Sequence, residues 1–298
     1  MSHKNNAKSF NYAVDIGHCH VYFDHKGHCI DKEIKIMAGQ VYWGLNTYRS
    51  NPEIIGDPTI LLLGDSWFWY PANNLASELA AQLDGEHRLL VLGRNGAEAQ
   101  EWSTKYKKEL ELALSWYGGN AQALLLSGGG NDIAGSEDFG PIIEDNCSKK
   151  SSVNECYSPG QPAAILSRIQ AAYREVIATF RRYNTTAPVF CHNYEKAWPS
   201  GKGVFGPAKW LKAPMDEAKV PKKFRHDLFV DLLEQLNASQ EELAEPSEKL
   251  APIVAIKTTG TLSDTEDIWA NELHLKPKQF SAMVTKAWIP ALKLAGVS

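Results

Sequence analysis

Short, continuous apolar segments alternate with amphipathic stretches along most of the chain from residue 59 onward. The first segment, residues 59–63, is almost wholly aliphatic and ends abruptly at Gly64-Asp65-Ser66. An uninterrupted aliphatic run of this length is typical of a strand that is buried on both faces at the centre of a parallel sheet. Such a strand carries its last residues to the carboxyl edge of the sheet, where open α/β proteins bind their ligands. We therefore expect Ser66 to lie at that edge.

The rest of this region repeats the same alternation. Apolar runs predict further strands at 88–93, 121–126, 188–192 and 253–256, and helical spacing of apolar residues predicts helices at about 75–83, 98–116, 163–183, 228–243 and 278–294. Strands that alternate with helices in this way form a parallel sheet with helices on both faces. The sequence thus predicts an α/β fold, a three-layer, doubly wound sheet of about five parallel strands. Residues 135–161 and 195–221 are predicted to be long loops of functional importance.

Residues 1–57 depart from this pattern. Val21-Tyr22-Phe23, polar residues at 24–27 and Cys29-Ile30 predict a β-hairpin, which is followed by aromatic-rich irregular chain. We interpret residues 1–57 as an N-terminal extension that packs on the α/β domain of residues 58–298.

The extension also contains a cluster of potential metal ligands, namely His18, Cys19, His20, His25, His28 and Cys29. Their spacing fits none of the standard zinc signatures, and the alternation of a strand sends neighbouring side chains to opposite faces. We therefore predict no metal site and favour a surface hairpin.

Composition narrows the classes of function. The net charge of −4 and the absence of a basic run argue against a nucleic-acid partner. The longest apolar runs are only as long as strands, so no membrane span is predicted. The first residues lead into no apolar core of signal-peptide length. We expect a cytoplasmic protein as the sequence stands, with export of a processed form as the alternative.

The five cysteines cannot all pair within one chain. Cys147 and Cys156 lie close together in a polar loop, and Cys19 and Cys29 flank the predicted hairpin. An exported form of the protein can therefore contain one or two disulfides, whereas five reduced thiols are expected in the cytosol.

Polar motifs follow the first three predicted strands: Gly64-Asp65-Ser66, Asn95-Gly96 and Gly129-Gly130-Asn131-Asp132, and His274 stands between the last strand and the last helix. Because the carboxyl ends of parallel strands meet at one edge, we expect these residues to come together. A serine hydroxyl needs a base within hydrogen-bond reach to act as a nucleophile, and imidazole titrates near the working pH. The motifs therefore favour nucleophilic catalysis by Ser66, with His274 as the base.

These motifs resemble those of the SGNH hydrolases, also called the GDSL family, which is named after Ser, Gly, Asn and His in this chain order. The resemblance extends over residues 59 to 294 and implies a flavodoxin-like sheet and ester hydrolysis through an acyl-enzyme, without metal or organic cofactor. It further implies that Ser66 is the nucleophile and His274 the general base and acid. The oxyanion hole would consist of the backbone N–H groups of Ser66 and Gly96 and the side-chain amide of Asn131.

The group that supports His274 is where the chain departs from the family. The family usually has an Asp three residues before the His, and this position holds Asn271. An asparagine can orient an imidazole through its carbonyl oxygen, but it offers no charge to an imidazolium. The segment 269–274 resembles a branch of the family with Asn-Glu-x-His after a Trp. Three arrangements stay open: Asn271 as the orienting partner, Asp267 reaching in from the preceding loop, or a Ser-His dyad assisted by a backbone carbonyl.

Further residues at this edge are candidates for contact with substrate. Trp67 follows the nucleophile and either lines a pocket or packs the first helix onto the sheet, and His192 ends the fourth strand at the same edge. Asp65 and Asp132 are expected to cap turns rather than to take part in chemistry.

The leading hypothesis is an esterase or lipase-like hydrolase acting on a small-molecule, lipid or carbohydrate ester. The alternatives are a carbohydrate O-acetyl esterase and a non-catalytic binding module on the same fold.

Overall fold

The computed structural model describes residues 39–51, 54, 56–70, 74–83, 85–135, 137–244 and 249–297, together with the backbone of two short strands near the N-terminus. The chain divides into two compact units, Met1–Ala38 and Gly39–Ser298. In the first unit, β1 (Ala13–Ile16) pairs antiparallel with β2 (Cys19–Tyr22). The first strand of the predicted hairpin thus corresponds to β2, but β2 pairs with β1, the segment that precedes it in the chain. The turn at 24–27, the second predicted strand and the side chains of the His and Cys cluster lie outside the described residues.

The second unit is built on a six-stranded, fully parallel sheet with the strand order β3-β5-β4-β6-β7-β8. The strands are β3 (Gln40–Trp43), β4 (Ile60–Gly64), β5 (Arg88–Gly93), β6 (Ala123–Ser127), β7 (Val189–His192) and β8 (Ile253–Ile256). The predicted fold class is confirmed, and the sheet has one strand more than expected. The additional strand is β3, which lies at the edge next to β5 and belongs to the segment interpreted as the extension.

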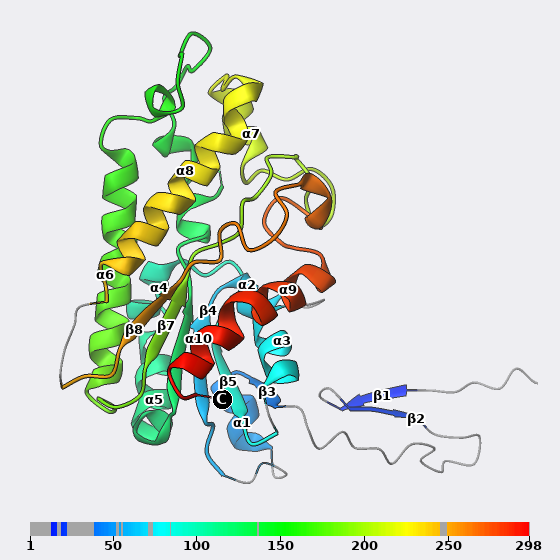
Figure 1. Ribbon diagram of the computed structural model, residues 1–298, viewed down its shortest axis with the longest axis vertical. Coiled ribbons are helices and arrows are strands. Elements are labelled where there is room, and N and C mark those ends of the chain that lie inside the picture. The colour runs from blue at the N-terminus through cyan, green and yellow to red at the C-terminus, as the bar shows by residue number, and fades with distance from the viewer. Residues whose placement is uncertain are drawn as a thin grey trace, which may run out of the picture. The chain divides into compact units, whose positions relative to one another are not determined.

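Helices cover both faces of the sheet, as Figure 1 shows. One layer contains α4 (Ala99–Ser103), α5 (Lys107–Tyr117), α6 (Gln161–Arg181) and α8 (Lys222–Glu241), and the other contains α2 (Ser66–Trp69), α3 (Leu75–Gln82), α9 (Pro277–Met283) and α10 (Ile289–Leu294). A π-helical turn at Val284–Trp288 joins α9 to α10, so the predicted closing helix is continuous. Short helices α1 (Leu45–Ser50) and α7 (Lys212–Glu217) complete the unit.

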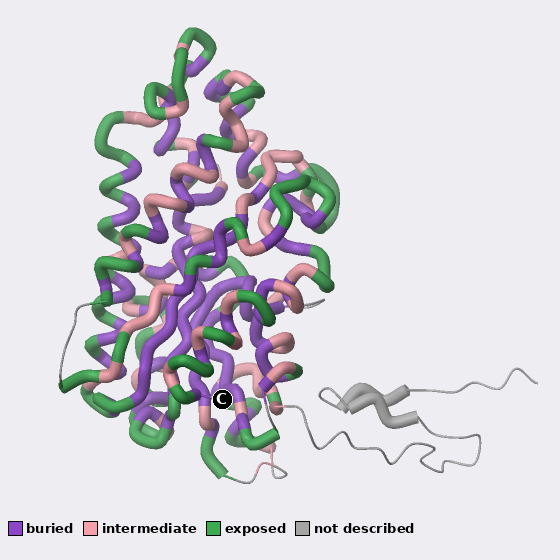
Figure 2. The backbone as a smooth tube through the Cα atoms, viewed as in Figure 1, coloured by how far each residue is buried: buried purple, intermediate pink, exposed green. Residues whose placement is uncertain are grey.

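The core follows the hydrophobic pattern of the sequence. All five residues of β4 and all five of β6 are buried, and both strands run through the centre of the buried region in Figure 2.

Among the described residues, no helix is both long and apolar enough to cross a membrane. The three cysteines whose side chains the structure describes, Cys147, Cys156 and Cys191, are buried free thiols. That residues 1–38 pack on the sheet unit stays a prediction.

The ends of β4 and β5 approach each other so closely that only glycine fits at one position. Gly93 has φ +98°, and a Cβ atom built there would lie 2.1 Å from the carbonyl oxygen of Gly64. The same carbonyl accepts a hydrogen bond of 3.1 Å from the backbone N–H of Arg94. The close approach therefore holds the loop after β5 against the residue that precedes Asp65 and Ser66.

We predict that Gly93→Ala lowers the free energy of unfolding by about 2–4 kcal/mol, because it combines a left-handed backbone with a backbone clash. Urea unfolding measures this loss. Gly140→Ala is the matched control, since a Cβ atom at Gly140 meets nothing within 4 Å. Equal stability of the two variants would contradict the expectation.

Candidate active site

Ser66 lies where β4 passes into α2, at the carboxyl edge of the sheet. Gly64 ends β4, and Asp65 caps α2 by accepting a hydrogen bond of 2.9 Å from the backbone N–H of Trp67. Ser66 is therefore the first residue of a helix, where a backbone N–H has no acceptor within the helix. The turn places the serine at the edge of the sheet where the sequence predicted it.

The carboxylate of Asp65 holds the surrounding loops together. It accepts hydrogen bonds from the hydroxyl of Ser127 at 3.0 Å, at the end of β6, and from the hydroxyl of Tyr194 at 2.6 Å, just after β7. Burial raises the pKa of Asp65 to about 6, whereas these hydrogen bonds favour the ionised form. Asp65 thus has a structural role and ties three strand ends together beside Ser66.

His274 contacts Ser66 directly. Its Nε2 lies 2.8 Å from the hydroxyl oxygen of Ser66, and its Nδ1 lies 3.0 Å from Oδ1 of Asn271. The imidazole is 5% exposed and stacks on the ring of Tyr70, with 4.0 Å between the ring centroids. Burial lowers the pKa of His274 to about 4, so the imidazole is neutral at pH 7.

Asn271 fixes which nitrogen of His274 carries the proton. Its Oδ1 also accepts hydrogen bonds of 2.9 Å from the backbone N–H groups of Leu273 and His274. Because a backbone N–H can only donate, the atom that these groups meet is the amide oxygen, and Nδ1 of the neutral imidazole must donate to it as well. The lone pair of the ring then resides on Nε2 and faces the hydroxyl of Ser66.

Of the arrangements that the sequence left open, the structure contains the one with Asn271. Asp267 lies on the 3₁₀ turn Glu266–Ile268, and its side chain is exposed. Among the hydrogen bonds of the described residues, none joins Asp267 to His274. Asp267 was therefore the wrong alternative, because proximity along the chain does not determine the direction in which a side chain points.

Glu272 is a residue whose importance the sequence analysis missed. It is fully buried and accepts hydrogen bonds from the backbone N–H groups of Gly201, Leu211 and Lys212 at 2.8, 3.1 and 3.0 Å. The loop of residues 195–221, which includes α7, is thereby fastened to the segment that carries Asn271 and His274. Glu272 points away from His274, and its place next to Asn271 was the only signal of this role in the sequence.

The loops after β5 and β6 carry Gly96 and Asn131, the other two residues predicted for the oxyanion hole. Gly96 lies in an exposed turn with φ +75°, and no acceptor for its N–H, or for that of Ser66, is found among the described residues. The side-chain amide of Asn131 donates to the carbonyl of Ala97 at 3.0 Å. Asp132, whose pKa burial raises to about 7, accepts from the N–H of Ala99 at 2.9 Å. Both contacts hold the turn of Gly96 against the loop of Asn131.

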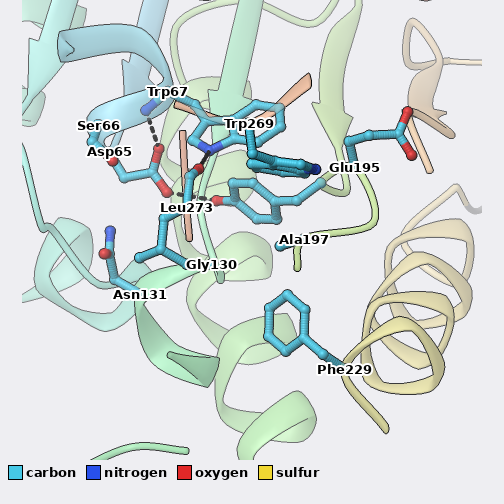
Figure 3. A pocket seen from close by; sticks show the side chains of 11 residues that line it. Asp65, Ser66, Trp67, Gly130, Asn131, Glu195, Ala197, Phe229, Trp269 and Leu273 are labelled. Atoms are coloured by element: carbon cyan, nitrogen blue, oxygen red, sulfur yellow. Dashed lines mark hydrogen bonds between the residues drawn. The ribbon is translucent and has the colours of Figure 1, made fainter. Parts of the chain in front are cut away.

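A pocket opens beside Ser66, with about 330 Å³ of space including the solvent at its mouth. Figure 3 shows the side chains around it. The lining comprises Asp65, Ser66, Trp67, Gly130, Asn131, Tyr194, Glu195, Ala197, Phe229, Trp269 and Leu273. The indole N–H of Trp67 donates to the carbonyl of Leu273 at 2.9 Å, and its ring meets that of Tyr194 edge to face. Trp67 thus both lines the pocket and packs α2 in place.

His192 does not reach the pocket, and its predicted contact with substrate was wrong. The side chain is fully buried, with Nε2 2.9 Å from the hydroxyl of Ser127 and Nδ1 bonded to the carbonyl of Asn193. Burial lowers its pKa to about 3, so it stays neutral. The strand ends at the expected edge, but His192 points into the core next to the ring of Trp288.

No protein-family model matches the chain, and no curated protein matches it. Solved structures with a similar fold include a lipase from a goat rumen metagenome, 15% identical over 81% of this chain and 98% of its own, with a TM-score of 0.49. Another is a carbohydrate esterase family 3 protein from Talaromyces cellulolyticus, 12% identical over 80% of this chain and 99% of its own, with a TM-score of 0.45. An extracellular lipase from Streptomyces rimosus is 12% identical over 80% of this chain and 99% of its own, with a TM-score of 0.43. These likenesses concern the fold alone.

Proposed function

We propose that this protein is a serine hydrolase that cleaves carboxylic esters through an acyl-enzyme on Ser66. The observation that supports this most directly is the chain of contacts from Ser66 through His274 to Asn271, with distances of 2.8 and 3.0 Å. A neutral imidazole with its lone pair on the hydroxyl is the arrangement that general-base activation of a serine requires.

The reaction follows from this arrangement. His274 Nε2 takes the proton of Ser66 as the serine oxygen attacks the ester carbonyl carbon. The negative charge on the carbonyl oxygen is stabilised by the N–H groups of Ser66 and Gly96 and the amide of Asn131, each contributing about 3 kcal/mol. His274 then returns the proton to the departing alkoxide, and the alcohol leaves. Water attacks the acyl-enzyme by the same route, which restores Ser66 and releases the acid.

The two alternatives have less support. A non-catalytic binding module would have no need of a buried, oriented imidazole in contact with a serine hydroxyl. A carbohydrate O-acetyl esterase would bind its sugar with aromatic rings and polar groups, and the lining beside Ser66, which includes Trp67, Trp269 and Asn131, does not favour it over a simpler ester.

We predict that Ser66→Ala lowers kcat/KM for p-nitrophenyl butyrate by at least about 10⁴-fold, because no other nucleophile replaces the hydroxyl. The variant should also fail to react with a fluorophosphonate probe. Ser115→Ala, at an exposed serine of α5, is the control and should keep full activity and labelling. Full activity of the Ser66 variant would refute the proposed function.

The depressed pKa of His274 predicts the pH profile. The reactive form is the neutral imidazole, so kcat/KM of the wild type should persist through weakly acidic pH and fall only as the pH approaches the pKa of about 4. In Asn271→Asp a carboxylate faces Nδ1 and favours the imidazolium, which raises the pKa. We expect the acid limb to move up by about 1–3 pH units.

The pH dependence of kcat/KM for the two enzymes measures this shift. Asn154→Asp adds the same charge at an exposed position of another loop and should leave the limb in place. If Asn271→Asp also leaves it in place, His274 is not the group that titrates.

A further inference from the structure

Two of the buried thiols lie side by side in the loop of residues 135–161, and no step of the proposed reaction uses them. We propose that Cys147 and Cys156 become joined by a disulfide bond as the chain folds in the presence of a small-molecule disulfide. This bond closes the loop tip, by which we mean residues 147–156.

The backbone on both sides of the loop tip brings the two cysteines together. Ile143 and Tyr157 form an antiparallel bridge, and the N–H of Glu144 donates to the carbonyl of Cys156 at 2.9 Å. The two segments of chain therefore run side by side up to the loop tip. Because these contacts are made by the backbone, they do not depend on any interaction between the thiols.

The thiols themselves are also in contact. Sγ of Cys147 lies 3.6 Å from the carbonyl oxygen of Cys156, and the thiol of Cys156 is a hydrogen-bond partner of the Cys147 thiol. The sulfur atoms of a disulfide are about 2.0 Å apart, so a small approach of the two side chains is enough to form the bond. Cys191 lies elsewhere, on β7, where its sulfur contacts the carbonyl of Val254 at 3.9 Å.

The loop tip has little apolar support of its own. Of residues 144–156, all of which the structure describes, Cys147 and Cys156 alone are buried. The loop precedes α6 in the chain and lies at the top of the view in Figure 1, away from the sheet. Disulfides replace apolar burial where a segment is too small or too polar to build a core. The surroundings therefore favour a crosslink at this position.

The bond forms by exchange with a small-molecule disulfide such as oxidised glutathione. The thiolate of one cysteine attacks a glutathione sulfur, which gives a mixed disulfide and releases one molecule of reduced glutathione. The thiolate of the other cysteine then attacks the protein sulfur of the mixed disulfide and releases the second molecule. Two electrons pass from the protein to glutathione, and the two thiol protons end on the released molecules.

The exchange takes place before the loop closes. Both cysteines are fully buried in the folded chain, and burial together with the neighbouring Cys156 thiol raises the pKa of Cys147 to about 12. The thiolate is the attacking species, so the folded, reduced protein reacts slowly. In the unfolded chain both thiols are accessible to the oxidant. Oxidation therefore accompanies folding.

The test is to refold the denatured, reduced chain in a mixture of reduced and oxidised glutathione. Remaining thiols are blocked with N-ethylmaleimide, and the protein is digested with trypsin without reduction. Cleavage after Lys149 and Lys150 places the two cysteines on separate peptides, residues 109–149 and 151–168. By mass spectrometry we expect these two peptides joined to each other and separated by reduction.

The crosslink should also stabilise the fold, because it restricts the unfolded chain. The midpoint of thermal unfolding should lie about 4–8 °C higher for wild type refolded with glutathione than for wild type refolded with excess phosphine reductant. In Cys147→Ala/Cys156→Ala, the matched variant, both refolding conditions should give the same midpoint. Cys191→Ala changes an equally buried cysteine and should keep the difference.

Recovery of peptides 109–149 and 151–168 as separate species, or joined to a peptide with another cysteine, would overturn the proposal. If refolding does not return native protein, wild type exported to an oxidising bacterial periplasm by an added signal sequence gives the same peptide readout. Ser66→Ala should form the crosslink as the wild type does. Failure of the disulfide and failure of ester hydrolysis are therefore separate results.

Discussion

The orientation of His274 depends on a single oxygen atom, Oδ1 of Asn271, which faces the ring nitrogen Nδ1 and two backbone N–H groups at once. An oxygen that meets three N–H groups cannot be exchanged with the amide nitrogen by a rotation of the side chain, so its position determines the tautomer of the imidazole. The ring is buried and uncharged, and its second nitrogen is left for the hydroxyl of Ser66. The rest of the site serves to bring that hydroxyl to the imidazole.

This assembly relies on buried acceptors that bind the backbone of neighbouring loops. Asp65 links the ends of β4, β6 and β7, and Asp132 joins the loop after β6 to the start of α4. Glu272 fastens the long loop of residues 195–221 to the segment that carries His274. A change at any of these carboxylates therefore alters several loops at once, and the geometry at Ser66 depends on residues that take no part in the chemistry.

Features that arise from local pattern could be predicted from the sequence. The aliphatic run of β4 predicted that Ser66 lies at the edge of the sheet, and the order of the motifs along the chain predicted that His274 lies close to it. β3 was missed because it is a four-residue edge strand of mixed polar and aromatic character, without a continuous apolar run. The direction of His192, the choice between Asn271 and Asp267, and the contribution of Phe229 from α8 all depend on tertiary packing. Strand alternation and chain proximity carry no information about these three features.

The stacking of Tyr70 on His274 has a consequence for a site that contains an amide where a carboxylate is usual. The two rings are nearly parallel, at 15°, and their centroids are 4.0 Å apart. An aromatic face carries partial negative charge, and it attracts a cation by about 0.5–2 kcal/mol when water is excluded. In the proposed reaction, Tyr70 therefore gains an attraction for the imidazole only while that ring holds the proton of Ser66. Under the proposed mechanism, the π face of the tyrosine would supply, during the reaction alone, part of the charge compensation that Asn271 lacks.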